Sequence, residues 1–129
     1  MVLDTSAVVA ILRDEPERAE LVQLLATAED PLISAATLLE SSIVLHAKAG
    51  DDGVADLDHL LQAAGVRCVA VDAAQALAAR TAWARYGKGR SPAALNFGDC
   101  FSYALATTLQ RPLLYKGDDF AQTDVLSAR

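Results

Sequence analysis

Short apolar runs alternate along this chain with longer segments whose apolar residues recur at helical spacing. The short runs predict strands at residues 1–3, 31–34, 66–71 and 112–115. The segments between them predict helices at residues 5–12, 17–28, 35–49, 51–64, 73–86 and 96–109. Several of these helices end at a glycine, namely Gly50, Gly65 and Gly87. Alternation of this kind predicts an α/β fold in which a parallel β-sheet is sandwiched by α-helices in a Rossmann-like three-layer arrangement.

Length and composition limit the chain to a single domain over residues 1–129. Hydrophobic residues make up 53% of it, which is enough for a real core. No apolar stretch approaches the roughly 18 residues of a membrane span, and the N-terminus lacks the pattern of an export signal, so we expect a cytoplasmic protein. Cys68 and Cys100 have no CxxC spacing and are expected to be small buried hydrophobic residues.

The net charge of −6 by itself argues against a nucleic-acid partner, because such binding depends on Lys and Arg replacing counterions on phosphates. A metal ion held by some of the acids would offset part of this negative charge. Basic residues also cluster, at Arg80, Arg85, Lys88 and Arg90. This cluster is either a solvated helix end and loop or a surface that contacts phosphates.

Four acidic residues occupy positions where a carboxylate is costly unless a positive charge lies nearby: Asp4, Glu40, Asp99 and Asp118. Asp4 and Asp118 each follow a predicted strand, and the carboxyl ends of parallel strands lie at the edge where α/β sheets bind ligands. Glu40 shares a helix face with core residues. Together the four acids predict a divalent metal site.

Each acid also has an ordinary structural explanation. Asp4 can cap the helix that follows it, and Asp99 can form a capping box with Asn96. Asp118 can stabilise a Gly-Asp turn, and Glu40 can tilt outward or form a salt bridge. A single carboxylate is therefore a weak signal, and the metal hypothesis depends on their convergence.

Histidine and cysteine chemistry is not indicated. His46 and His59 stand near no acid at a zinc-ligand spacing and are expected to face solvent. No Ser-His-Asp or Cys-His arrangement and no Gly-rich phosphate loop is present. Oxygen ligands from carboxylates suit Mg²⁺, which prefers octahedral oxygen and keeps part of its water shell.

The order and spacing of these motifs resemble a PIN domain, in the form found in VapC toxins of bacterial toxin–antitoxin pairs. The resemblance is carried by the opening strand and its Asp4-Thr5-Ser6, a mid-helix Glu40, and the segments Leu95–Ala104 and Leu113–Phe120. It extends over essentially the whole chain.

The resemblance implies an endoribonuclease that uses Mg²⁺, with Mn²⁺ as the alternative ion, to hydrolyse RNA phosphodiester bonds with a metal-activated water. The expected products carry a 5′-phosphate and a 3′-hydroxyl. The resemblance also implies a VapB-type antitoxin that inhibits the enzyme, a homodimer, and a heterotetramer or larger assembly with the antitoxin.

The family's acidic residues can be carried over position by position. Asp4, Glu40 and Asp99 match its three principal acids, expected both to bind metal and to act in catalysis. Asp118 is our choice for the fourth such acid, with Asp119 and Asp124 as alternatives. Ser6 matches a hydroxyl that contacts the metal or its water.

The mode of RNA binding stays open at this level. Trp83 and Tyr86, which lie beside basic residues on one predicted helix, either stack on unpaired bases or pack in the core or a dimer interface. Arg13 and Lys116 are alternative phosphate contacts.

Two other functions compete with the nuclease. A phosphatase with Asp4 as nucleophile would require a second Asp where Ser6 stands, which disfavours it. The other alternative is a non-catalytic metal-binding α/β module that only binds a protein partner.

Overall fold

The computed structural model describes residues 1–129 and confirms the predicted α/β class. Its strands are β1 (Val2–Leu3), β2 (Leu32–Ser34), β3 (Arg67–Val69) and β4 (Leu113–Leu114). Its α-helices are α1 (Thr5–Leu12), α2 (Arg18–Ala26), α3 (Ala35–Ala63), α4 (Ala73–Tyr86) and α5 (Phe97–Thr108). A 3₁₀ turn, η1 (Phe120–Gln122), follows the last strand.

The sheet has the strand order β3-β2-β1-β4, and every pairing is parallel. The chain moves outward from β1 to β2 to β3 and then returns to add β4 on the other side of β1. Strand order therefore reverses beside β1, and ligands of open α/β sheets bind at the carboxyl ends of the strands around such a point. Asp4 immediately follows β1.

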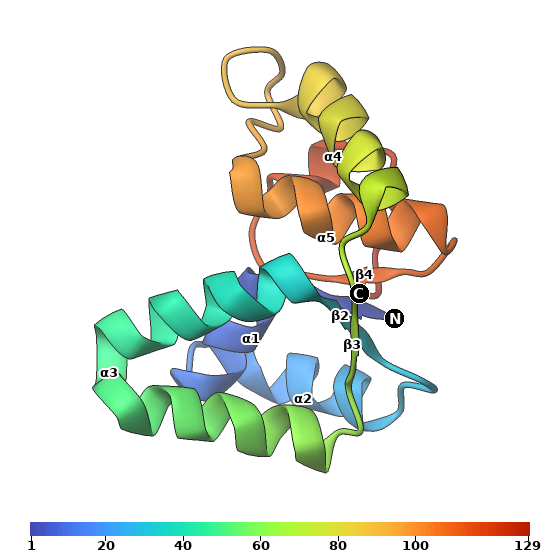
Figure 1. Ribbon diagram of the computed structural model, residues 1–129. Helices are drawn as coiled ribbons and strands as arrows, with labels where there is room; N and C mark the ends of the chain where they lie inside the picture. The colour runs from blue at the N-terminus through green and yellow to red at the C-terminus, as the bar shows by residue number, and fades with distance from the viewer.

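Two hydrophobic cores lie on opposite faces of the sheet. Helices α4 and α5 cover one face, and α1, α2 and α3 cover the other (Figure 1). Successive strand residues point to opposite faces, so Val2 and Leu113 join the first core, whereas Leu3 and Leu114 join the second. This arrangement is the predicted three-layer sandwich.

Helix α3 is in effect the two helices that the sequence predicts. Gly50 interrupts it with φ 63° and ψ −149°, a conformation that glycine adopts without a steric penalty. The chain folds back at this point, so the two halves of α3 lie side by side (Figure 1). The first half carries Glu40 toward the carboxyl edge of the sheet.

The predicted element boundaries are close to the observed ones, and strands 66–71 and 112–115 are shorter than expected. The prediction for cysteine is wrong at one of its two positions. Cys100 is buried in α5, but Cys68 is exposed on the edge strand β3, and neither forms a disulfide. None of the helices combines the length and hydrophobicity needed to cross a lipid bilayer.

Candidate metal centre

Asp4 is the most enclosed acid of the candidate centre, with only 2% of its surface exposed. One carboxylate oxygen, Oδ2, accepts hydrogen bonds from the Ser6 backbone N–H (2.9 Å) and the Ser6 hydroxyl (2.6 Å). The other, Oδ1, accepts one from the Ser102 hydroxyl of α5 (2.7 Å). Asp4 therefore caps α1, as its position suggested, and is also fixed from α5. These three hydrogen bonds fix the orientation of the buried carboxylate.

Asp99 lies in the first turn of α5 and forms the capping box that the sequence suggested. The Asn96 side chain accepts from the Asp99 N–H (2.9 Å), and Asp99 Oδ2 accepts from the Asn96 N–H (2.9 Å). The second oxygen of Asp99 has no protein partner. The capping role therefore leaves one oxygen available to a cation.

The electrostatic surroundings of Asp99 show which acids converge. Burial, and then the negative charges of Asp4, Glu40 and Asp119, raise the pKa of Asp99 from 3.8 to about 7, against the opposing effect of the Asn96 backbone hydrogen bond. Acids brought together in this way repel one another unless a proton or a cation is present. The structure thus gathers acids from the end of β1, from α3, from α5 and from the segment after β4.

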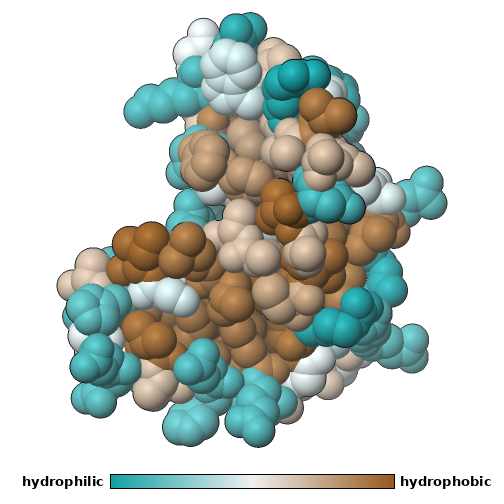
Figure 2. All heavy atoms as spheres, in the orientation of Figure 1, coloured by the Kyte–Doolittle hydropathy of each residue, from teal (hydrophilic) through white to brown (hydrophobic).

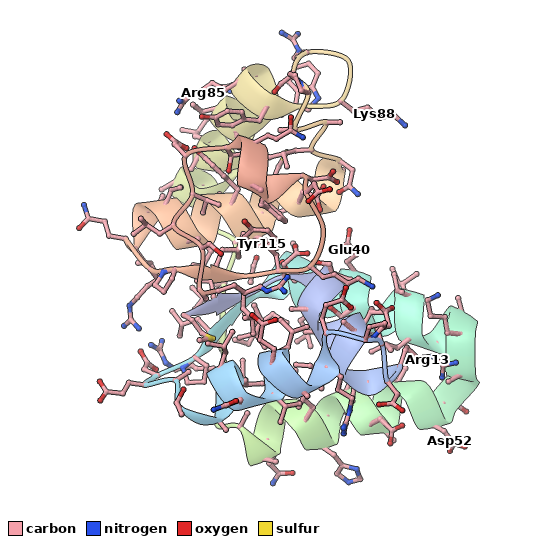
Figure 3. All side chains as sticks on the ribbon, turned by 180° about the vertical axis from the view of Figure 1, so that it is seen from behind. Arg13, Glu40, Asp52, Arg85, Lys88 and Tyr115 are labelled. Carbon is pink, nitrogen blue, oxygen red and sulfur yellow. The ribbon has the colours of Figure 1, made fainter.

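Glu40 reaches this cluster because Gly98 leaves room for it. Its carboxylate lies directly against the Gly98 backbone, where a Cβ atom on residue 98 would overlap it. Glu40 is half-buried and takes part in no salt bridge. Figure 3 shows it at the junction between the layer containing α3 and the layer containing α5. The carboxylate thus points into the cluster and has no protein cation to neutralise it.

The three candidates for the fourth acid have different surroundings. Asp118 and Asp119 are both exposed in the turn after β4, and the charge of Asp119 is among the main causes that raise the pKa of Asp99. Asp124 accepts a hydrogen bond from the Tyr103 hydroxyl and pairs with Arg85 at 3.3 Å, and these contacts lower its pKa. Asp124 is therefore already neutralised by protein groups.

Two of the basic residues predicted to contact phosphates form ion pairs with acidic residues of the protein. Lys116 forms ion pairs with Glu15 and Glu17, so its charge is already compensated. Arg85 is likewise paired, and it points to the opposite side of the molecule from Lys88 (Figure 3). The basic cluster of the sequence is therefore two separate surfaces in space.

The donor set suits a hard divalent cation. As the side chains lie, no group of three or more His, Cys, Asp or Glu residues is arranged to hold a metal ion. Mg²⁺, however, is commonly bound by one or two carboxylates with water completing its shell. The free oxygen of Asp99, the unpaired carboxylate of Glu40 and the remaining lone pair of Asp4 provide such ligands. His46 and His59 are exposed, as predicted.

Sequence reasoning missed two residues that build this centre. Ser102 is fully buried and links Asp4 to Thr37 (3.0 Å between the hydroxyls), but a serine in an apolar helix gives no local sign of its partner. Gly98 did carry a signal, since glycine in the first turn of a helix costs stability relative to alanine. The structure explains the glycine, because the Glu40 carboxylate lies where a side chain on residue 98 would be.

Metal-free protein should lose stability as the pH rises toward 7 because of Asp99. The folded-state pKa, about 7, lies above the ordinary value of 3.8, so the folded chain binds the extra proton and releases it as the pH rises. We expect Asp99→Asn, which keeps the capping acceptor, to stabilise the protein by about 1–2 kcal/mol at pH 8 and much less at pH 4, after allowance for solvent screening. Urea unfolding of both proteins in EDTA at several pH values measures this difference. An equal stability difference at all pH values would contradict it.

The chain belongs to the PIN domain family, whose model matches residues 1–126, and the family expected from the sequence is thus confirmed. It is 56% identical to a protein named Ribonuclease VapC from Mycolicibacterium smegmatis, over 97% of both chains. It is 49% identical to Ribonuclease VapC30 of Mycobacterium tuberculosis, over 97% of this chain and 95% of that protein.

Solved structures support the fold independently of sequence identity. The crystal structure of Mycobacterium tuberculosis VapC20, described as a sarcin-ricin loop cleaving toxin, has a TM-score of 0.81 at 18% identity and matches 99% of this chain and 98% of that one. VapBC2 from Rickettsia felis, bound to a DNA fragment from its promoter, has a TM-score of 0.72 at 18% identity and matches 98% of this chain and 94% of that one.

Proposed function

We propose that this protein is the toxin of a type II toxin–antitoxin system and acts as a metal-dependent endoribonuclease. The observation that carries the proposal is the gathering of Asp4, Glu40 and Asp99 around the first turns of α5, through the Ser102–Asp4 hydrogen bond and the contact of Glu40 with Gly98, at the point where strand order reverses. Relatives named as VapC ribonucleases, matched over nearly their whole length, support the same conclusion.

The chemistry of the site fits phosphodiester hydrolysis. A phosphodiester is anionic, so attack by water requires a stronger nucleophile and stabilisation of the charge that develops on the phosphoryl oxygens. When bound, Mg²⁺ or Mn²⁺ supplies a Lewis acid that meets both needs. The protein's part is to hold the ion, to orient its carboxylates and to admit the RNA strand.

Individual residues have distinct parts in this proposal. Asp4 is the fixed ligand, because Ser6 and Ser102 hold both of its oxygens in place. Asp99 offers its free oxygen from the N-terminal turn of α5, and Glu40 offers its carboxylate across Gly98. Ser6, which in the sequence matched a hydroxyl that contacts the metal or its water, lies against Asp4 and helps to orient it. Its hydroxyl donates to Asp4 and accepts from the Lys116 N–H at 3.0 Å.

We assign the fourth acid to Asp119 rather than to Asp118, because the Asp119 charge is among the main causes that raise the pKa of Asp99. We expect Asp119→Asn to reduce metal-dependent RNA cleavage by about tenfold or more, and Asp118→Asn to reduce it by less than about twofold. The two substitutions are matched, since both remove one charge from adjacent exposed residues. The assay is cleavage of total cellular RNA with Mg²⁺, Mn²⁺ or EDTA.

Three results of this assay would contradict part of the proposal. Cleavage that persists in EDTA would refute metal dependence, and a greater loss with Asp118→Asn would restore Asp118 as the fourth acid. A clean preparation with no metal-dependent cleavage would favour the non-catalytic binding module.

The proposed partners are RNA, a second copy of the chain and a VapB-type antitoxin, in a heterotetramer or larger complex. Hydrophobic side chains gather over the side of the molecule formed by α1 to α3 (Figure 2). On α3, Leu39 is 62% exposed and Ile43 is 60% exposed, on either side of Glu40 in sequence. Exposed apolar residues next to the proposed centre suit a protein partner that covers it.

A further inference from the structure

A second feature of the molecule, separate from the acids, is an aromatic groove between α4 and α5. It has a volume of about 590 Å³ and is lined by Trp83, Phe97 and Phe101, among other residues. Phe97 is 80% exposed and Trp83 is 45% exposed, although large aromatic side chains are normally covered. Phe97 is held by an edge-to-face contact with Phe101, with 5.0 Å between ring centroids. The structure therefore presents a positioned aromatic surface to solvent.

The groove adjoins the acidic centre through the N-terminus of α5. Phe97 immediately precedes Gly98, on which the Glu40 carboxylate lies, and Asp99 follows. Asn96 lines the groove, and its side-chain oxygen accepts a hydrogen bond from the Asp99 N–H. The side-chain N–H groups of Asn96 have no protein acceptor. A chain held at the acids would thus pass directly beside the aromatic surface.

The rim of the groove is basic in an otherwise acidic protein. Arg80 and Lys88 line it, and neither forms a salt bridge. The Arg90 guanidinium lies over the Trp83 ring at 4.1 Å from its centroid, so it covers one face of this ring and adds a further cation beside the groove. In contrast, Tyr86 packs against Tyr103 in the core, with 5.7 Å between ring centroids.

We propose that this groove binds an unpaired nucleobase of the RNA, adjacent to the phosphodiester that is cut. The inference rests on the proposed function and adds to it a base-binding site beside the acids, formed by α4 and the start of α5. Aromatic rings stack on any base, and nearby Lys and Arg contact the backbone phosphates. A base paired within a duplex cannot offer its face to Phe97 and Trp83. The unpaired cations Arg80 and Lys88 at the rim favour an anionic RNA strand over a second copy of this chain, whose matching groove carries the same positive charges.

The protein carries its own probe for this site, because Trp83 is its single tryptophan. We would measure Trp83 fluorescence during titration in EDTA with a ten-nucleotide single-stranded RNA, the same strand with abasic positions, and the same strand in a duplex. Stacking should quench the fluorescence with the intact single strand only. Phe97→Ala should weaken binding of that strand by about tenfold, whereas Phe97→Tyr, which keeps an aromatic ring, should bind it as the wild type does.

The controls separate this inference from the proposed function. Leu126→Ala removes another exposed apolar side chain, 63% exposed, from outside the groove and should not change binding. Metal-dependent cleavage is measured in parallel. If the wild-type protein cleaves RNA but Phe97→Ala binds the single strand as tightly as the wild type does, the groove inference alone would be overturned. Quenching without any cleavage would overturn the proposed function and leave the groove as a base-binding site. A Phe97→Ala protein that changes only from dimer to monomer, with RNA binding unaltered, would also overturn the groove inference.

Discussion

Replacing Asp4 by asparagine should nearly abolish RNA cleavage while leaving the fold intact. Asp4 is the most buried acid of the proposed centre, and its charge is positioned by hydrogen bonds from Ser6 and Ser102. Losing about 4 kcal/mol of charge stabilisation in the transition state corresponds to roughly a thousandfold decrease in rate. Asparagine keeps an oxygen that accepts the Ser6 N–H, so helix α1 stays capped.

A matched control for this variant is Asp72→Asn. Asp72 caps α4 in the same way, by accepting from the Gln75 N–H at 2.9 Å, and it is exposed and outside the acidic centre. Cleavage of RNA in Mg²⁺ and circular dichroism during heating would be measured for both variants. We expect similar folding and a rate loss for Asp4→Asn only. Equal cleavage by the two variants would show that Asp4 is merely a helix cap.

Gly98→Ala is the second change from which we expect a large effect, although it adds only one methyl group. This methyl would overlap the Glu40 carboxylate, so Glu40 must leave its position or α5 must shift. Either movement displaces the acids of the proposed centre, and we expect cleavage to fall by about a hundredfold. Thermal unfolding should show at most a modest loss of stability, below about 1 kcal/mol, because the overlapping atoms are the far end of the flexible Glu40 side chain, which can move aside.

The double variant Gly98→Ala with Glu40→Ala tests the cause. Removing the Glu40 carboxylate removes the overlap, and alanine is favoured over glycine within a helix by about 1 kcal/mol. Stability should therefore return to at least the wild-type value, whereas cleavage should stay low because a proposed ligand is missing. If the double variant is as unstable as Gly98→Ala, the damage arises from a contact other than Glu40.

Much of the framework was predictable because it depends on local pattern. The apolar runs and helical spacings located every strand and helix to within a few residues, and Gly50 marked the turn within α3. Parallel strands also place their carboxyl ends at one edge, so the position of Asp4 beside β1 implied its position in the fold. The joint spacing of the motifs was sufficient to indicate the PIN family.

The composition of the site was only partly predictable, because capping and metal binding require the same residue types at the same positions. Asp4 and Asp99 are helix caps and are also members of the acidic cluster, so neither interpretation excluded the other. The basic residues near the end of α4 look like one cluster in sequence. In the structure Arg85, on α4, pairs with Asp124, whereas Lys88, in the loop after α4, lines the aromatic groove.

By itself, the sequence determined the order of elements and the three-layer class, which follow from periodicity along the chain, and the resemblance of its motifs indicated the family. The tertiary structure alone decided which side chains meet. Ser102 reaches Asp4 across 98 positions of sequence, and Glu40 reaches the cluster only where Gly98 has no side chain. Such contacts depend on how α3 and α5 pack across the edge of the sheet, and that packing is set by the two cores together rather than by any local segment.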